Sequence, residues 1–186
     1  MNKAILLAVV LTRLPVQAQP GSNACARPAI GSIVPSPGEL RSSGGKLRVD
    51  LALRTSLDIF GLTAYCYIGS TGDQAPTLRV KPGDELVLAL RNELPPESPA
   101  SAGHVHAAAC AGGAMTKSST NLHFHGLNVP PTCHQDEVIR TLIQPSAEPF
   151  EYRIHIPETQ KPGLTGIIRI PTGSARARFS AEPPAL

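Results

Sequence analysis

Proline and glycine interrupt this chain so often that they leave little room for a long helix. Its 186 residues include 19 prolines and 16 glycines, and the segments between them are short. Proline removes a backbone donor and fixes φ, and glycine weakens the interior of any regular element. No stretch shows the 3.6-residue period of an amphipathic helix, whereas several short stretches alternate between apolar and polar residues. The sequence therefore predicts an all-β chain.

Alternating segments indicate where the strands lie. Residues 46–55 place leucines and a valine on one side and mainly charged residues on the other, as in a half-buried strand. Residues 150–156 alternate in the same way, with aromatic and isoleucine side chains directed inward. Further strands are expected at the following segments: 59–68, 77–80, 85–91, 120–125 and 138–143. Turn signals separate these segments, so the pattern favours a sandwich or a Greek-key barrel.

The N-terminus reads as a secretion signal over residues 1–18. Lys3 gives a basic start, residues 4–11 are apolar, and Val16-Gln17-Ala18 is a small-residue cleavage pattern. The apolar run is shorter than the roughly 20 residues that a membrane-spanning helix needs, so no membrane span is expected. A helix at the start of the mature protein is the alternative. We therefore expect a secreted or periplasmic protein.

The rest of the chain divides by composition. Residues 19–45 are rich in proline, glycine and serine and are expected to form a leader or loop, and residues 46–171 contain the expected strands. Residues 172–186 form a divergent tail without the pattern of a barrel strand. The net charge of +3 comes from the two ends, because residues 19–163 hold 12 basic and 13 acidic side chains. No basic face therefore indicates a nucleic-acid partner.

Four cysteines follow the expected signal, which favours disulfides in an oxidising compartment. Three pairings are possible, and the sequence does not choose among them. Our working hypothesis joins Cys110 to Cys133 and Cys25 to Cys66.

The feature with the most specific chemistry is a histidine pair in the expected strand 120–125. Residues two apart on a strand share a face and lie about 6–7 Å apart at Cα, so His123 and His125 point the same way. Leu122 and Phe124 then point to the opposite layer. Two imidazoles on one rigid edge can hold one metal ion or two adjacent ions, and imidazole suits copper and zinc. Two surface histidines without a metal are the alternative.

Three segments, in order, resemble the multicopper oxidase family of laccase-like type. Residues 76–84 resemble the segment before the first copper-binding strand of those enzymes, and residues 120–127 resemble that strand. Parts of residues 150–163 resemble the segment after that strand, so the match covers roughly half of the chain. The resemblance implies the N-terminal domain of a multicopper oxidase, a cupredoxin-like Greek-key β-barrel. Because the likeness stops after residue 164, an incomplete C-terminal end is part of this expectation.

The resemblance also implies roles for three residues. In that family a trinuclear copper cluster lies between the first and last domains. His123 would bind the type 2 copper, and His125 would bind one of the type 3 coppers. Asp136 stands where laccase-like members place an acidic residue beside the cluster, so it would orient a ligand and relay protons. The alternative for Asp136 is a loop carboxylate that caps a turn.

The sequence departs from the family pattern after residue 164. The family continues into a second His-x-His-Gly motif, whereas this chain has no histidine after Gly163. A type 1 copper site needs a cysteine and two histidines, and no histidine lies between Cys110 and the internal methionine Met115. An altered reading frame, a truncation and a divergent end all fit this departure. The chain thus supplies only part of the expected copper site.

The remaining histidines are expected to be structural or solvated. His104 and His106 form a second His-x-His, but it lies in the long loop 95–119 rather than on an expected strand. His134 neighbours Cys133 and reads mainly as a loop residue, although it can approach a metal. His155 lies on the outer face of its strand.

Two classes of function are consistent with these features. The first is a copper-dependent oxidoreductase module that oxidises phenols or metal ions and reduces oxygen, with copper ions as cofactor. This chain alone is not expected to be active, because four-electron reduction of oxygen needs several metals close together. The second is a non-catalytic module that holds a single copper ion, or a degenerate fragment of such a domain.

Overall fold

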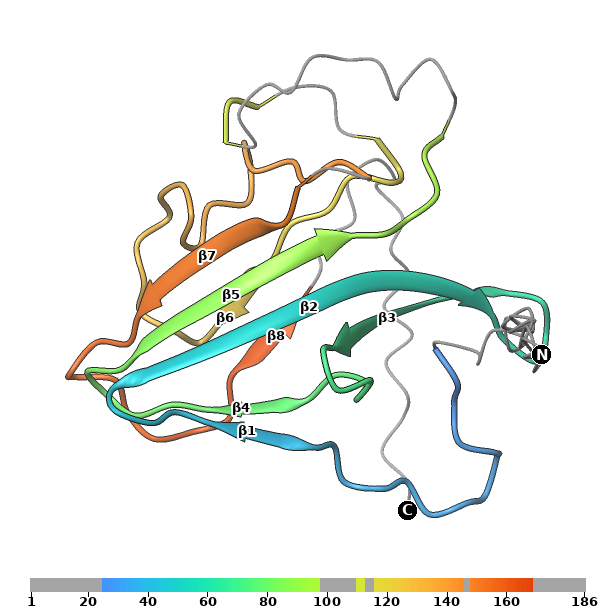
Figure 1. Ribbon diagram of the computed structural model, residues 1–186, viewed down its shortest axis with the longest axis horizontal. Coiled ribbons are helices and arrows are strands. Elements are labelled where there is room, and N and C mark those ends of the chain that lie inside the picture. The colour runs from blue at the N-terminus through green and yellow to red at the C-terminus, as the bar shows by residue number, and fades with distance from the viewer. Residues whose placement is uncertain (1–24, 98–109, 113–115, 146–147, 169–186) are drawn as a thin grey trace, which may run out of the picture.

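The computed structural model describes residues 25–97, 110–112, 116–145 and 148–168. The expected signal (1–18), the pair His104 and His106, and the expected tail (172–186) lie outside these residues. Within the described ranges the chain forms strands and no helix, so the all-β prediction is confirmed (Figure 1). No described segment is a helix long and apolar enough to cross a bilayer.

The described strands form one main sheet and two small ones. In chain order the strands are β1 (Glu39–Arg41), β2 (Lys46–Leu57), β3 (Thr63–Gly69), β4 (Thr77–Arg79), β5 (Glu85–Asn92), β6 (His123–His125), β7 (Phe150–His155) and β8 (Gly166–Ile168). The main sheet has the order β3-β2-β5-β7, with a parallel central pair, β2 and β5, between antiparallel outer pairs. β1 pairs in parallel with β4, and β6 pairs in antiparallel fashion with β8.

The core lies between the inner face of the main sheet and the histidine strand β6. The apolar residues of β2 and β7 that were expected to face inward are buried, and so is the apolar run of β5. Leu122 and Phe124 close this core from the opposite side, with exposures of 0% and 1%. The Phe124 ring meets the Tyr152 ring edge to face at 5.7 Å. The Tyr152 hydroxyl accepts a hydrogen bond from the Leu122 N–H at 2.9 Å, and burial raises the pKa of Tyr152. This contact ties the histidine strand to β7.

The barrel is not closed in the described part of the chain. There β4 pairs with β1 and β8 pairs with β6, but β4 and β8 do not pair with each other. Residues from both strands, including Leu78 and Ile167, line a cavity of about 800 Å³. Leu51, Leu86 and Phe124 contribute to its other walls. The expectation of an all-β sandwich or barrel with an incomplete end is therefore confirmed.

An ionic network covers the outer face of the main sheet. Lys46 pairs with Glu85 at 2.7 Å, Glu85 with Arg153 at 3.6 Å, and Arg153 with Glu151 at 2.6 Å. Val87 lies between Arg48 and Arg153 in the register of the three strands and is completely buried. Long charged side chains bury apolar surface with their stems while their heads stay in water. The network thus covers an apolar residue on the solvent side of the sheet.

Several expected elements differ from the structure. Residues 138–143 form no strand, because the Glu137 carboxylate accepts the N–H groups of Ile139, Arg140 and Thr141 and holds them in a turn. The only strand-like pairing in this segment is an isolated bridge between Thr120 and Ile143.

Other differences lie at element ends. β3 begins at Thr63 instead of residue 59, because the Asp58 carboxylate accepts the N–H groups of Phe60 and Leu62 and makes that segment a turn. The expected leader, 19–45, contains strand β1. The ladder of the histidine strand extends over residues 123–125 instead of 120–125.

Gly83 permits the turn that leads into β5. It has φ +84 and is the third residue of Lys81-Pro82-Gly83-Asp84, which the Asp84 N–H closes on the Lys81 carbonyl at 3.1 Å. A Cβ at position 83 would lie 2.6 Å from Glu158 Oε1. We expect Gly83→Ala to lower the free energy of unfolding by about 1–3 kcal/mol, measured by urea denaturation.

Gly163→Ala is the matched control, because a Cβ there meets nothing within 4 Å. It should change the free energy of unfolding by less than about 0.5 kcal/mol. Equal losses in the two variants would contradict this account of the turn.

Candidate metal centre

Strand β6 presents His123 and His125 side by side. Their ring centroids are 5.4 Å apart, with an interplanar angle of 69°. His123 is half-buried and His125 is exposed, whereas Phe124 between them faces the core. Gly126 follows with φ +86, so the chain turns away directly after the second histidine. The two-residue period of a strand thus separates two imidazoles on one face from an anchoring side chain on the other.

A carboxylate fixes the ring of His123. Asp136 Oδ1 and Oδ2 lie 2.9 and 3.1 Å from His123 Nδ1, and Oδ1 also accepts the Phe124 N–H at 2.9 Å. The Asp136 side chain is 14% exposed and the His123 side chain 31%. A carboxylate accepts hydrogen bonds, so the proton of the imidazole belongs on Nδ1 and the lone pair on Nε2. Such an arrangement orients an imidazole for a metal at Nε2.

The loop that carries Asp136 is itself held in place. Asn121, just before β6, donates from Nδ2 to the carbonyls of Val138 at 2.8 Å and Thr141 at 3.2 Å. Burial acts to raise the pKa of Glu137, but hydrogen bonds from the Arg140 N–H and the Thr141 hydroxyl, with others nearby, lower it overall. The Glu137 carboxylate therefore favours its charged form, in which it caps the turn. These contacts position the neighbouring Asp136 against β6.

Strand β8 lies directly beside the histidine pair. His125 is opposite Gly166, and a Cβ at position 166 would lie 3.8 Å from His125 Cβ. A Cβ at this distance would be in ordinary van der Waals contact with His125, so the two strands pack closely beside the histidine pair. Sequence reasoning missed this strand, although the isoleucines at 167 and 168 carried a β-branched signal for it.

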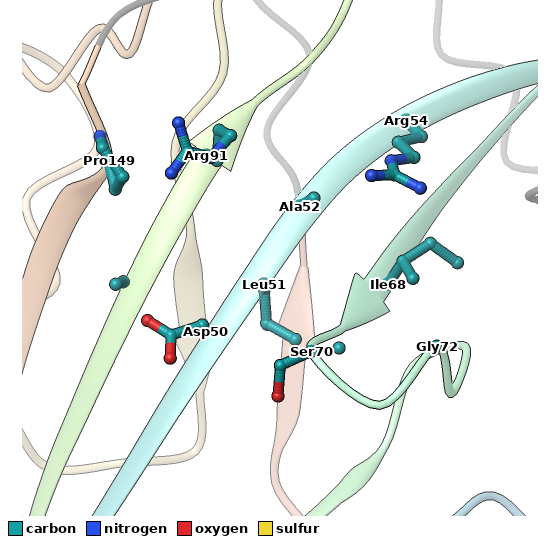
Figure 2. Close-up of a pocket in the computed structure, with 11 residues that line it drawn as sticks. Asp50, Leu51, Ala52, Arg54, Ile68, Ser70, Gly72, Arg91 and Pro149 are labelled. Carbon is teal, nitrogen blue, oxygen red and sulfur yellow. The ribbon is translucent and has the colours of Figure 1, made fainter. Parts of the chain in front are cut away.

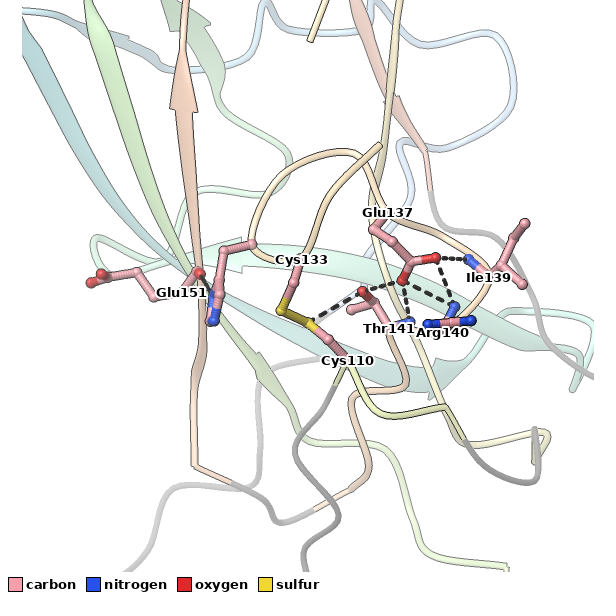
Figure 3. The surroundings of a disulfide bond; sticks show 8 residues. Cys110, Cys133, Glu137, Ile139, Arg140, Thr141 and Glu151 are labelled. Carbon is pink, nitrogen blue, oxygen red and sulfur yellow. Dashed lines mark hydrogen bonds between the residues drawn. A yellow bond between two sulfur atoms is a disulfide. The ribbon is translucent and has the colours of Figure 1, made fainter. Parts of the chain in front are cut away.

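The structure contains two disulfides, Cys25–Cys66 and Cys110–Cys133, so the working hypothesis for the pairing is confirmed. Disulfides of this kind fit an oxidising, extracytoplasmic compartment. Figure 3 shows the Cys110–Cys133 bond near the turn capped by Glu137, with the Thr141 hydroxyl 3.8 Å from Cys110 Sγ. This disulfide joins the segment before β6 to the loop that carries Asp136.

The structure places His134 and His155 away from the pair on β6. His134 Nδ1 donates to the Glu151 carbonyl at 2.7 Å, and its ring stacks on Phe150 at 4.7 Å. His155 is exposed on β7, opposite Glu85 in the adjacent strand. Within the described residues, three donor atoms that lie within 4.8 Å of one another belong to Cys110, Cys133 and His134. Because the two sulfurs are bonded to each other, they do not offer thiolates to a metal.

A hollow of about 350 Å³ lies on the outer face of the main sheet (Figure 2). Arg54, Arg91 and Asp50 contribute to its walls. Arg54 already pairs with Glu93 at 2.6 Å, so its charge is balanced within the chain. This hollow lies on the opposite side of the sheet from the core and contains none of the candidate metal ligands.

The donor set on β6 fits copper. Imidazole is a ligand that suits copper as well as zinc, and the Asp136 carboxylate orients one of the two imidazoles. Two histidines leave most of the coordination sphere of an ion to water or to ligands from elsewhere. As a metal site, the histidine pair would therefore be open rather than closed.

Comparison with protein-family models and with curated proteins found no match for this chain. Solved structures with a similar arrangement include a multicopper oxidase from Campylobacter jejuni, described as a metallo-oxidase. It is 20% identical, with a TM-score of 0.40 over 67% of this chain and 23% of that chain. A variant of the McoA multicopper oxidase from Aquifex aeolicus is 14% identical, with a TM-score of 0.40 over 67% and 22%.

A laccase-like multicopper oxidase, CueO from Ochrobactrum sp., is 18% identical, with a TM-score of 0.36 over 67% of this chain and 23% of that chain. The chain therefore spans less than a quarter of the length of these solved structures. At these TM-scores the likeness does not establish a family.

Proposed function

We propose that this chain is a copper-binding, cupredoxin-like module of the multicopper oxidase type. Its own residues supply one part of a copper cluster. His123 and His125 are the metal ligands, the first toward a type 2 copper and the second toward a type 3 copper. The observation that carries the proposal is the pair of imidazoles on β6, 5.4 Å apart, with Asp136 hydrogen-bonded to His123 Nδ1.

The proposal assigns Asp136 two tasks. Its carboxylate orients the His123 ring and keeps Nε2 available for the metal. It also lies next to His123, which suits a group that would relay protons during oxygen reduction. Copper, when bound, would supply the one-electron chemistry. The substrates proposed are phenols or metal ions, with oxygen as the electron acceptor.

In this proposal the chain is secreted and residues 1–18 are removed. The cupredoxin-like domain covers residues 46–171, preceded by a leader (19–45) and followed by a tail (172–186). Two disulfides support the compartment. A complete cluster would require histidines from another domain or chain. We therefore propose that this chain does not reduce oxygen by itself.

A second candidate is a non-catalytic module that holds one copper ion. The openness of the site favours it, because His125 is exposed and no third donor atom lies within ligand reach of both histidines in the described residues. Both candidates predict that the chain alone binds copper without turnover. They differ when another domain or chain supplies further histidines, because only the first candidate then gains turnover.

The test is copper content of the purified secreted chain after titration with Cu(II), with oxygen uptake on a phenolic substrate in the same sample. We expect about one copper per chain and no oxygen uptake, because two imidazoles hold one or two adjacent ions but build no cluster. Turnover with three coppers would show that further ligands complete the cluster. A chain that takes up no copper would contradict both candidates.

A further inference from the structure

We propose that Cys110, Cys133 and His134 form a second metal site, which binds Cu(I) when the Cys110–Cys133 disulfide is reduced. The donor atoms of these three residues lie within 4.8 Å of one another, and none of them belongs to the pair on β6. The site therefore does not depend on the function proposed for His123 and His125.

The distances suit one ion. Ligand atoms that each lie about 2.0–2.3 Å from a three-coordinate ion stand about 4 Å from one another. The Cα atoms of the two cysteines are 5.7 Å apart, so two thiolates on these residues can converge once the sulfur–sulfur bond is broken. His134 follows Cys133 directly in the chain, which keeps the imidazole close to the sulfurs.

His134 is held in an unusual backbone conformation at this place. Its φ is +66, in the left-handed region that non-glycine residues rarely adopt. Three contacts hold it there: the Arg153 N–H donates to its carbonyl at 2.7 Å, Nδ1 donates to the Glu151 carbonyl at 2.7 Å, and the ring stacks on Phe150. The bond to Glu151 fixes the tautomer and leaves Nε2 with a lone pair. A metal-binding histidine commonly has its other nitrogen held in this way.

The ligand set selects the metal. Two thiolates are soft donors that suit Cu(I), and one imidazole can complete a three-coordinate site for this ion, whereas Zn(II) would need a water molecule as its fourth ligand. The Glu137 carboxylate, which shares the Thr141 hydroxyl with Cys110, already accepts several backbone hydrogen bonds. It is thus engaged in the turn rather than available as a fourth ligand.

The redox step has a defined balance. A dithiol reductant gives two electrons to the Cys110–Cys133 bond, which breaks into two thiols, and the reductant becomes its own disulfide. Binding of one Cu(I) then displaces two protons from the thiols. Cys133 and His134 are exposed and Cys110 is half-buried, so a small reductant can reach the bond. A disulfide oxidant that accepts two electrons from the two thiolates would re-form the Cys110–Cys133 bond, become a dithiol itself and release the ion.

The test uses the full secreted chain, reduced with a dithiol that is removed by anaerobic gel filtration. Cu(I) affinity is measured by competition with the chromophoric chelator bathocuproine disulfonate, and Zn(II) affinity is measured in parallel. We expect the reduced chain to bind Cu(I) at least about tenfold more tightly than the oxidised chain, since loss of ligands costs at least this much. X-ray absorption should show two sulfurs and one nitrogen on the copper.

Matched variants assign the ligands. The double variant Cys110→Ser, Cys133→Ser should show no increase in Cu(I) affinity on reduction. Any increase that remains in this variant measures what Cys25 and Cys66 contribute when they are reduced. His134→Asn should weaken Cu(I) binding about tenfold, and asparagine tolerates the left-handed conformation. The double variant His123→Ala, His125→Ala should still show the increase in Cu(I) affinity on reduction. This result would separate the site from the one on β6.

Several results would overturn the proposal. Equal Cu(I) affinity in the reduced chain and the double serine variant would remove the thiolates as ligands. Sulfur-only coordination, or no effect of His134→Asn, would remove the imidazole. Tighter binding of Zn(II) than of Cu(I) would overturn the choice of metal. Loss of the β-sheet circular dichroism signal on reduction would show that the folded chain cannot form the site.

Discussion

Replacing His123 with alanine is expected to lower copper affinity at least about tenfold while the fold stays intact. His123 lies on the solvent side of β6, 31% exposed, so its removal opens no cavity in the core. It removes one of two imidazoles and the group that Asp136 orients. The measurement is Cu(II) affinity by isothermal titration calorimetry, with thermal unfolding of the same sample. Unchanged copper affinity would contradict the proposal that His123 is a copper ligand.

Asp136→Asn is the matched variant for the orienting role. Asparagine keeps the shape of the side chain and an oxygen that can accept the Phe124 N–H, but it removes the negative charge beside His123 Nδ1. The fall in affinity should be smaller than for His123→Ala. His155→Ala is the control, because this exposed histidine on β7 takes no part in the proposed site. A fall in affinity for His155→Ala comparable with that for His123→Ala would indicate nonspecific surface binding of copper.

Phe124→Ala is expected to lower the free energy of unfolding by about 3–5 kcal/mol, the usual cost of truncating a buried phenylalanine. Phe124 is 1% exposed and packs edge to face on Tyr152. Domains of this size are stable by only about 5–15 kcal/mol, so the loss would be a large fraction of the total. Chemical denaturation with the disulfides intact measures it.

Ile33→Ala is the control for the core prediction. Ile33 is 94% exposed, so its truncation should change the free energy of unfolding by less than about 0.5 kcal/mol. Similar losses for Phe124→Ala and Ile33→Ala would mean that Phe124 is not part of a packed core. Together with His123→Ala, these variants test whether strand β6 binds copper with one face and stabilises the core with the other.

Local patterns predicted much of this fold. β2 and β7 were predictable because their apolar residues alternate over many positions, and a period of two is itself evidence of a strand with one buried face. The same period placed His123 and His125 on one side and Leu122 and Phe124 on the other. The turn at Gly83 was predictable because proline and glycine occupy the two central positions that such a turn requires.

The elements that the sequence did not predict depend on contacts between distant residues. β1 and β8 are three residues long and exist through pairing with β4 and β6, which no local pattern reveals. The expected strand 138–143 fails because one side chain, Glu137, takes over its backbone donors. For the same reason the sequence suggested Asp136 only through resemblance. Its direct contact with His123 depends on how Asn121 and Glu137 hold the loop.

The pairing of the central strands has a consequence for how quickly the chain folds. β2 joins β5 in parallel, with β3 and β4 between them in the sequence, and β5 joins β7, with the histidine strand between them. Apart from the β2–β3 hairpin, the pairings of the main sheet are therefore non-local, and the entropy of closing long loops must be lost before they form. We expect refolding on the millisecond-to-second scale typical of β-rich domains with such contacts. During that time the proposed copper ligands on β6 have no completed main sheet to pack against.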